Sequence, residues 1–215
     1  MTDHPLLPGR LWQRGEQFAD EPVRWPVEAS RRAYDSDFVQ LREDDVRGLD
    51  GEVFTRVVVE HQGAVGVVAL DEDDRVLALL QYRHAVGARL VEVPAGILDV
   101  AGEEPQQTAA RELAEEAGVV ARSWSPLLRM WSSPGMTDEH WHLFVVRDLA
   151  PAAPDAIGER QHEEADIEVV WVPLDDAVRA VLDGRITSPI AVAGLLAVWV
   201  GRRVTRWGTD ITDSP

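Results

Sequence analysis

Three glutamates crowd one short stretch of the sequence, AARELAEEAGV at residues 109–119. At about 100° per residue, Glu112, Glu115 and Glu116 share one face of a helix. Like charges at this spacing repel one another, so either water screens them or cations lie among them. Most such clusters are solvated surface, but converging carboxylates also form the oxygen-only site that Mg²⁺ prefers. Arg111, in the middle, can hold one carboxylate through a bidentate bond and fix its orientation.

The residues around this stretch predict how it is positioned. Pro105 suits the first turn of a helix and Gly118 suits the left-handed position just after one, so we expect a helix over 105–117. The alanines of this helix and Leu113 lie on the arc beside the glutamates and can pack closely on a sheet. One end of this helix leads straight out of the loop AGILDVAGEE.

Runs of apolar and β-branched residues predict the strands. We expect a hairpin over 38–60, a strand pair over 63–84, a short strand over 89–96, two strands over 123–149, a strand over 166–172, and helices over 174–185 and from Ser188 onward. Residues 11–37 show little periodicity and are interpreted as irregular or appended structure. This order of elements predicts an α/β fold with a mixed sheet and helices on both faces.

The composition limits the classes of function. The 215 residues suit one main core, and 38 acidic against 21 basic residues give a formal net charge of −17. That charge repels nucleic-acid polymers, and a small anionic substrate would need divalent cations in the site. Because cysteine is absent, a disulfide, a thiolate metal site and a cysteine nucleophile are excluded. The start of the chain lacks signal-peptide features and the longest apolar run, 190–200, is too short to span a bilayer, so we expect a cytoplasmic protein without a membrane partner.

The stretch GILDVAGEEPQQTAARELAEEAGV, residues 96–119, resembles the Nudix box, the signature of hydrolases that cut a nucleoside diphosphate linked to another group. From Glu103 onward every signature position is matched, including the Arg-Glu and Glu-Glu pairs. One residue more than usual separates Gly96 from Glu103, which leaves open which backbone carbonyl would reach a metal. The resemblance implies a Nudix-type α/β/α sandwich with a mixed sheet and a small N-terminal β appendage.

The same resemblance implies a metal site. Glu112 and Glu116 would be the main ligands, and the carbonyl oxygen of Ala95 would be an additional one. Glu115 would be either a ligand or a nearby base. The implied cofactor is Mg²⁺, with Mn²⁺ as the alternative. Cations held here would offset the repulsion among the glutamates and bridge to a pyrophosphate.

Outside the box, the sequence is similar to the ADP-ribose pyrophosphatase branch of the family. The loop SSPGMTDEHW resembles the substrate loop of that branch, and an ordinary Pro-Gly turn is the alternative. Arg83 in QYRH would bind phosphate, or else form a salt bridge at a strand end. The substrate-binding residues implied by the resemblance are Arg56, Arg83, Ile97, Ser133, Pro134, Gly135 and Glu139. The implied reaction is Mg²⁺-dependent hydrolysis of the pyrophosphate bond of ADP-ribose to AMP and ribose 5-phosphate.

The long loop before the last strand holds HEEAD, and in the resembling branch a glutamate of this loop activates water or holds a metal. Glu164, or next Glu163, would take this catalytic role beside Glu115, although a solvated loop acid would look the same in the sequence. Two other readings stay open. The substrate could be another nucleoside diphosphate sugar or a dinucleotide, or the protein could be a sensor that binds ADP-ribose without cutting it. Such sensors tend to lose the box acids that this sequence keeps.

The resemblance also divides the chain. Residues 1–60 would form an N-terminal segment and β-hairpin, 61–207 the Nudix hydrolase domain, and 208–215 a tail. In the resembling branch the enzymes are dimers whose N-terminal strands pack on the partner, so we expect a homodimer. The small-molecule partner would be a nucleoside diphosphate sugar.

Overall fold

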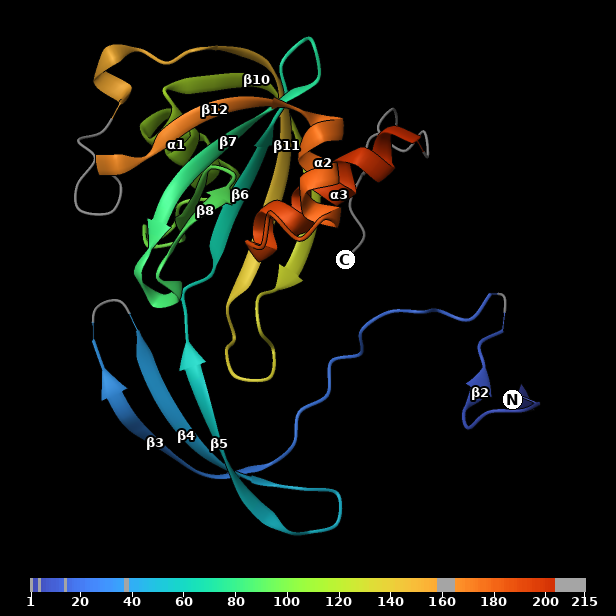
Figure 1. Cartoon of the computed structure of the whole chain (residues 1–215). Coiled ribbons are helices and arrows are strands. Elements are labelled where there is room, and N and C mark those ends of the chain that lie inside the picture. Colours follow the sequence, from blue (N-terminus) through green and yellow to red (C-terminus); the bar gives the residue numbers. More distant parts are fainter. Residues whose placement is uncertain (1, 4, 14, 37–38, 158–164, 204–215) are drawn as a thin grey trace.

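The computed structural model describes residues 2–3, 5–13, 15–36, 39–157 and 165–203 (Figure 1). Its α-helices are α1 (Pro105–Ala117), α2 (Leu174–Leu182) and α3 (Pro189–Arg203), and its short 3₁₀ helices are η1 (His84–Val86) and η2 (Pro154–Ala156). Its strands are β1 (Thr2–Asp3), β2 (Arg10–Leu11), β3 (Val27–Asp35), β4 (Gln40–Arg47), β5 (Val53–Glu60), β6 (Ala64–Ala69), β7 (Arg75–Arg83), β8 (Ala88–Glu92), β9 (Ala95–Ile97), β10 (Val119–Trp131), β11 (His140–Pro151) and β12 (Glu168–Pro173). No helix within these described ranges is long and apolar enough to cross a membrane.

Two sheets form the body of the molecule. One has the order β10-β11-β6-β9 and is mixed, because β11 runs parallel to β6 while the other neighbours are antiparallel. The other has the order β12-β7-β8 and is antiparallel throughout. Figure 1 shows α1 on one side of these strands and α2 with α3 on the other. The predicted α/β fold with a mixed sheet covered by helices on both faces is confirmed.

Strand β6 shows how the sequence allows helices to pack on both faces of the sheet. Val65 and Val67 are fully buried in a cluster that contains Ala109 and Leu113 of α1. Val68 points the opposite way, because successive side chains of a strand alternate, and it packs in the cluster formed with α2 and α3. A nearly continuous apolar run is what a strand buried on both faces requires.

The prediction that residues 63–84 form a pair of neighbouring strands is wrong. β6 and β7 lie in different sheets and meet at an isolated bridge between Leu70 and Val76. Each strand has two edges for hydrogen bonding, and those of β6 are taken by β11 and β9 while those of β7 are taken by β12 and β8. The acidic turn between the two strands therefore joins two sheets instead of closing a hairpin within one.

Helix α1 is confirmed over the predicted residues 105–117, and local signals fix both of its ends. At the start, the main-chain N–H of Glu104 donates a hydrogen bond to Oε1 of Gln107 at 3.0 Å, beside the predicted proline. At the end, Gly118 has φ of 66°, a left-handed conformation that glycine adopts without strain. Both ends of α1 are therefore set by residues that are close to them in the sequence.

Strands β3, β4 and β5 form a separate antiparallel sheet, drawn below the body in Figure 1. The hairpin predicted over 38–60 is confirmed as β4 and β5. Residues 27–35, predicted to be irregular or appended, are not irregular, because they form β3 of this separate sheet. All nine residues of β3 are exposed, so neither face of this strand packs on a core. The strand therefore does not need the alternation of apolar residues by which strands are predicted. Polar pairs across the strands hold it instead, with Ser30 bonded to Asp44 at 2.7 Å and Arg31 paired with Glu43 at 2.6 Å.

Candidate active site

Helix α1 and strand β9 meet at two close contacts that fix the box acids. A Cβ atom on Gly96 would lie 2.2 Å from Cδ of Glu112, so only glycine leaves room for this carboxylate. Oε2 of Glu116 accepts a hydrogen bond from the main-chain N–H of Ala95 at 2.8 Å, and Glu116 is only 7% exposed. The two glutamates, one helical turn apart, are thus both held against the main chain of β9.

The guanidinium of Arg111 lies close to four acidic side chains. Its Nη1 donates to Oε1 of Glu112 at 2.7 Å and to Oε2 of Glu115 at 3.2 Å. Its Nη2 lies 3.5 Å from Oε2 of Glu103 and 3.7 Å from Oδ1 of Asp99. Burial opposes the charged guanidinium, but the surrounding carboxylates outweigh that effect and raise the pKa of Arg111. In the part of the chain that the structure describes, its buried Nε and Nη2 have no hydrogen-bond partner.

The carboxylates around Arg111 suit the binding of a hard divalent cation. One guanidinium faces the carboxylates of Asp99, Glu103, Glu112 and Glu115, and Glu116 lies beside them. Negative charge therefore exceeds positive charge here, and every side-chain atom that could bind a metal is an oxygen. Among the described residues, no three acidic, His or Cys side chains stand close enough to form a ligand set by themselves. Mg²⁺ commonly binds one or two carboxylates and completes its shell with water and substrate phosphates. Glu112 and Glu116 fit that requirement.

A cavity of about 1150 Å³ opens beside these two glutamates. Its lining brings together predicted residues that lie far apart in the sequence: Arg83, Ala95, Ile97, Glu112, Glu116 and Glu139. The space accommodates a ligand of the size of a nucleotide sugar. Two of the box acids and an arginine therefore face the same cavity.

Arg83 reaches the cavity from the end of β7. Its Nη2 donates to Oε2 of Glu92 at 2.6 Å and its Nε donates to the same oxygen at 3.1 Å. Arg83 thus forms a salt bridge, which was the alternative to phosphate binding in the sequence analysis. It does not exclude phosphate binding, because a guanidinium carries five N–H donors.

The loop over 132–139 is anchored to the end of β5. The main-chain N–H of Val59 donates to the carbonyl of Met136 at 2.8 Å, and the N–H of His61 donates to Oδ1 of Asp138 at 2.9 Å. Glu139 ends the loop and lines the cavity, where its Oε1 lies 3.7 Å from Nδ1 of His61. The remaining predicted residues of this loop, Ser133, Pro134 and Gly135, are exposed at its turn and do not line the cavity.

Two further predicted residues that the structure describes, Glu115 and Arg56, do not line the cavity. Glu115 pairs with Arg111 and does not line the cavity. Arg56 lies over the ring of Phe54, with its guanidinium carbon 4.2 Å from the ring centroid. Glu163 and Glu164, and the tail predicted over 208–215, lie outside the described residues.

Sequence reasoning missed other polar residues of the lining, namely His61, Gln81, Glu92, Asp99, Ser132 and Ser188. Gln81 precedes Arg83 by two positions, so strand alternation places both side chains on one face, and this signal was available. Asp99 lies in the box loop that carries the extra residue, which hid its role beside Arg111. His61 and Ser188 carry no comparable signal in a single sequence.

Comparison with known proteins agrees with this geometry. The sequence model described as NUDIX domain matches residues 60–190, and the chain belongs to the Nudix hydrolase family. It is 47% identical over 158 residues to an ADP-ribose pyrophosphatase of Mycobacterium tuberculosis, covering 74% of this chain and 75% of that protein. It is 33% identical over 155 residues to an ADP-ribose pyrophosphatase of Bacillus subtilis, covering 71% and 80%. The crystal structure of an ADP compounds hydrolase shares the fold, with a TM-score of 0.73 over 87% of this chain and 99% of that one at 18% identity.

Proposed function

We propose that this protein hydrolyses the pyrophosphate bond of ADP-ribose, using Mg²⁺, to give AMP and ribose 5-phosphate. The observation that carries the proposal is that Glu112, Glu116 and Arg83 line one cavity of nucleotide-sugar size. The names of the two relatives support ADP-ribose as the substrate. The retained box acids support hydrolysis over binding alone.

The residues of the chain would divide the work in the following way. Glu112 and Glu116, with the carbonyl of Ala95, would hold the divalent cation. The cation, when bound, neutralises pyrophosphate oxygens and lowers the pKa of water. Arg83 would donate hydrogen bonds to a phosphate group.

The reaction needs a water molecule and a base. Water adds to one phosphorus, the anhydride P–O bond breaks, and the proton of the water passes to a carboxylate. We assign this base to Glu164 or Glu163, following the resemblance. Glu115 would act through Arg111, which it contacts, and thereby stabilise the position of Glu112.

The proposal is tested by a substrate panel with Mg²⁺ and with Mn²⁺. ADP-ribose, other nucleoside diphosphate sugars, dinucleoside polyphosphates and an oxidised nucleotide are compared by kcat/KM, with the products identified. We expect the highest kcat/KM for ADP-ribose, with AMP and ribose 5-phosphate released in equal amounts. A higher kcat/KM for another compound would replace the substrate, and tight ADP-ribose binding without AMP release would indicate a sensor.

We also propose that the protein is a homodimer joined through its N-terminal strands. Large apolar side chains are exposed on or beside the β3-β4-β5 sheet, among them Trp25, Val27, Tyr34 and Val57. Such groups on a thin sheet gain stability when a partner covers them. Light scattering over a dilution series should give the mass of a dimer, and a monomer at every concentration would refute the proposal.

A further inference from the structure

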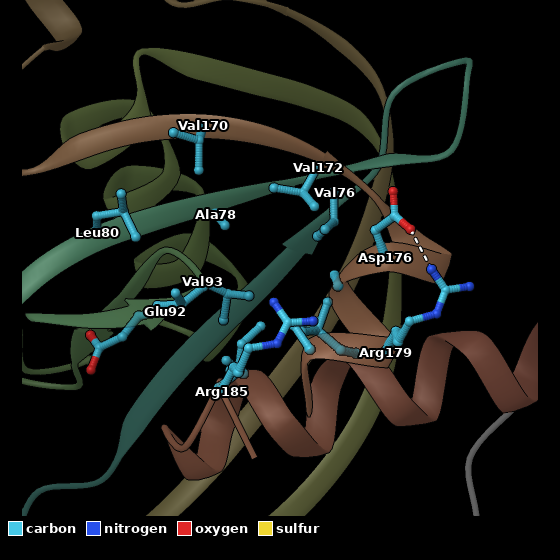
Figure 2. Close-up of a pocket in the computed structure, with 16 residues that line it drawn as sticks. Val76, Ala78, Leu80, Glu92, Val93, Val170, Val172, Asp176, Arg179 and Arg185 are labelled. Carbon is cyan, nitrogen blue, oxygen red and sulfur yellow. Dashed lines mark hydrogen bonds and ion pairs between the residues drawn. The ribbon is translucent and has the colours of Figure 1, made fainter. Parts of the chain in front are cut away.

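Glu92 occupies an unusual place at the end of β8. It is 6% exposed, and in the described part of the chain it is the one residue that lines both the active-site cavity and a second cavity of about 430 Å³. Figure 2 shows this second cavity between the β12-β7-β8 sheet and the helices α2 and α3. Glu92 therefore stands in the wall between the two cavities.

The second cavity is mainly apolar where it meets Glu92. Ala78 and Val93 of its lining are buried side chains without polar groups. In Figure 2 the carboxylate of Glu92 lies on the side away from these residues. An apolar wall offers an ionised carboxylate no hydrogen bonds, so the charge must be satisfied on the other side.

That other side is occupied by Arg83. The Glu92 carboxylate engages the edge of the guanidinium formed by Nε and Nη2, with Nε lying 3.2 Å from Oε1 and 3.1 Å from Oε2. Contacts from two nitrogens of a planar group fix its orientation as well as its position. The Glu92 side chain is 8% exposed and the Arg83 side chain is 41% exposed, so the carboxylate is the anchored partner and the guanidinium extends into the active-site cavity.

We propose that Glu92 is a positioning residue for catalysis, which aims the Arg83 guanidinium at the pyrophosphate of the substrate. The identity of that substrate rests on the function proposed above, but the coupling between the two residues does not. Arg83 belongs to the exposed end of β7, and without Glu92 its long side chain could adopt many rotamers. A pyrophosphate would then have to order the side chain on binding, which weakens binding.

The test is a double-mutant cycle with Glu92→Gln and Arg83→Ala. Gln keeps the volume of Glu92 and removes its charge, and we expect kcat/KM to fall by about 10-fold to 100-fold, mainly through a higher KM. In the Arg83→Ala background, Glu92→Gln should change kcat/KM by less than about twofold, because the group it positions is gone. A purely structural role would instead lower the fraction of folded enzyme, which reduces kcat and leaves KM unchanged.

The matched control is Asp71→Asn. Asp71 is also paired with an arginine, since its Oδ2 accepts from Nε of Arg75 at 2.6 Å, but this pair lies at the opposite end of β7. Its kcat/KM should stay within about twofold of the wild type. If Glu92→Gln fails to fold in a thermal unfolding scan, Glu92→Asp replaces it in the cycle, because it keeps the buried charge and moves it by one methylene.

The outcomes separate this inference from the proposed function. The cycle is measured with whichever compound of the substrate panel the wild type cuts fastest. Additive effects of the two substitutions on kcat/KM, or a Glu92→Gln variant with unchanged KM, would overturn the positioning role while ADP-ribose hydrolysis stands. Coupled effects measured on a different substrate would support the positioning role while ADP-ribose is rejected.

Discussion

The carboxylate of Glu112 lies directly over the main chain of Gly96, where a Cβ atom would be 2.2 Å from Cδ of the glutamate. The φ of Gly96 is not in the left-handed region, so close approach is the reason for glycine here. The absence of a side chain at this position lets a helical carboxylate reach the backbone of β9. The first glycine of the box thus serves the position of an acid sixteen residues later in the chain.

Gly96→Ala should therefore inactivate the enzyme without unfolding it. The atoms in the way belong to the flexible end of Glu112, which can rotate aside at little cost to the fold. We expect kcat to fall about 100-fold, because the displaced carboxylate can no longer hold a cation in place. Steady-state kinetics and thermal unfolding check this together, and a variant with wild-type kcat would show that Glu112 is not needed where it lies.

Glu116→Gln should abolish most activity and keep the fold. The amide oxygen of Gln can still accept the hydrogen bond from Ala95, so the local packing survives, but the negative charge is lost. We expect kcat to fall by about 100-fold or more, with a weaker apparent affinity for Mg²⁺. Glu115→Gln is the matched comparison on the same helix and should lose much less, since Glu115 does not line the cavity. Equal losses in the two variants would contradict the assignment of Glu116.

Asp44 should make the N-terminal sheet sensitive to acid. The hydrogen bond from the Ser30 hydroxyl, opposed by burial and aided by Arg42, lowers the pKa of Asp44 in the folded protein. A carboxyl whose pKa is lower in the folded than in the unfolded state stabilises the fold above its ordinary value, near 3.9, and this stability is lost as the pH falls through the folded value.

Asp44→Asn should therefore lower the Tm by about 2–5 °C at pH 7. The gap in Tm between the wild type and the variant should narrow as the pH drops below about 4, because the wild-type carboxylate is then being protonated. Thermal unfolding scans from pH 7 to about pH 3 measure the gap. A gap that stays constant over this range would mean that the charge of Asp44 contributes nothing.

Part of this structure follows from local sequence signals. Helix α1 was predictable to the residue because its proline, its capping box and Gly118 all act within one turn of its ends. The pairing of β6 with β11 and β9 was not, since which strand takes an edge depends on segments distant in the chain. β3 escaped prediction because its stabilising partners are charged residues on β4 and not an apolar pattern of its own.

The residues of the site were also only partly predictable from the sequence. Glu112 and Glu116 followed from helical geometry and from the resemblance, and both line the cavity. Helical geometry also placed Glu115 with them, but it could not predict that Arg111 donates a hydrogen bond to Glu115 and holds this side chain away from the cavity lining. Glu92 was missed because its role depends on a partner across the β7–β8 ladder, which no local pattern in the sequence reveals.

The central claim is that a divalent ion held by Glu112 and Glu116 makes the pyrophosphate bond breakable in this strongly acidic protein. The most direct test is a crystal structure of the protein with Mn²⁺ and a methylene analogue of ADP-ribose that cannot be cut. We predict an anomalous peak within about 2.3 Å of carboxylate oxygens of both glutamates, with an oxygen of the analogue in the same coordination shell. A fully bound analogue with no metal at these two side chains would contradict the account.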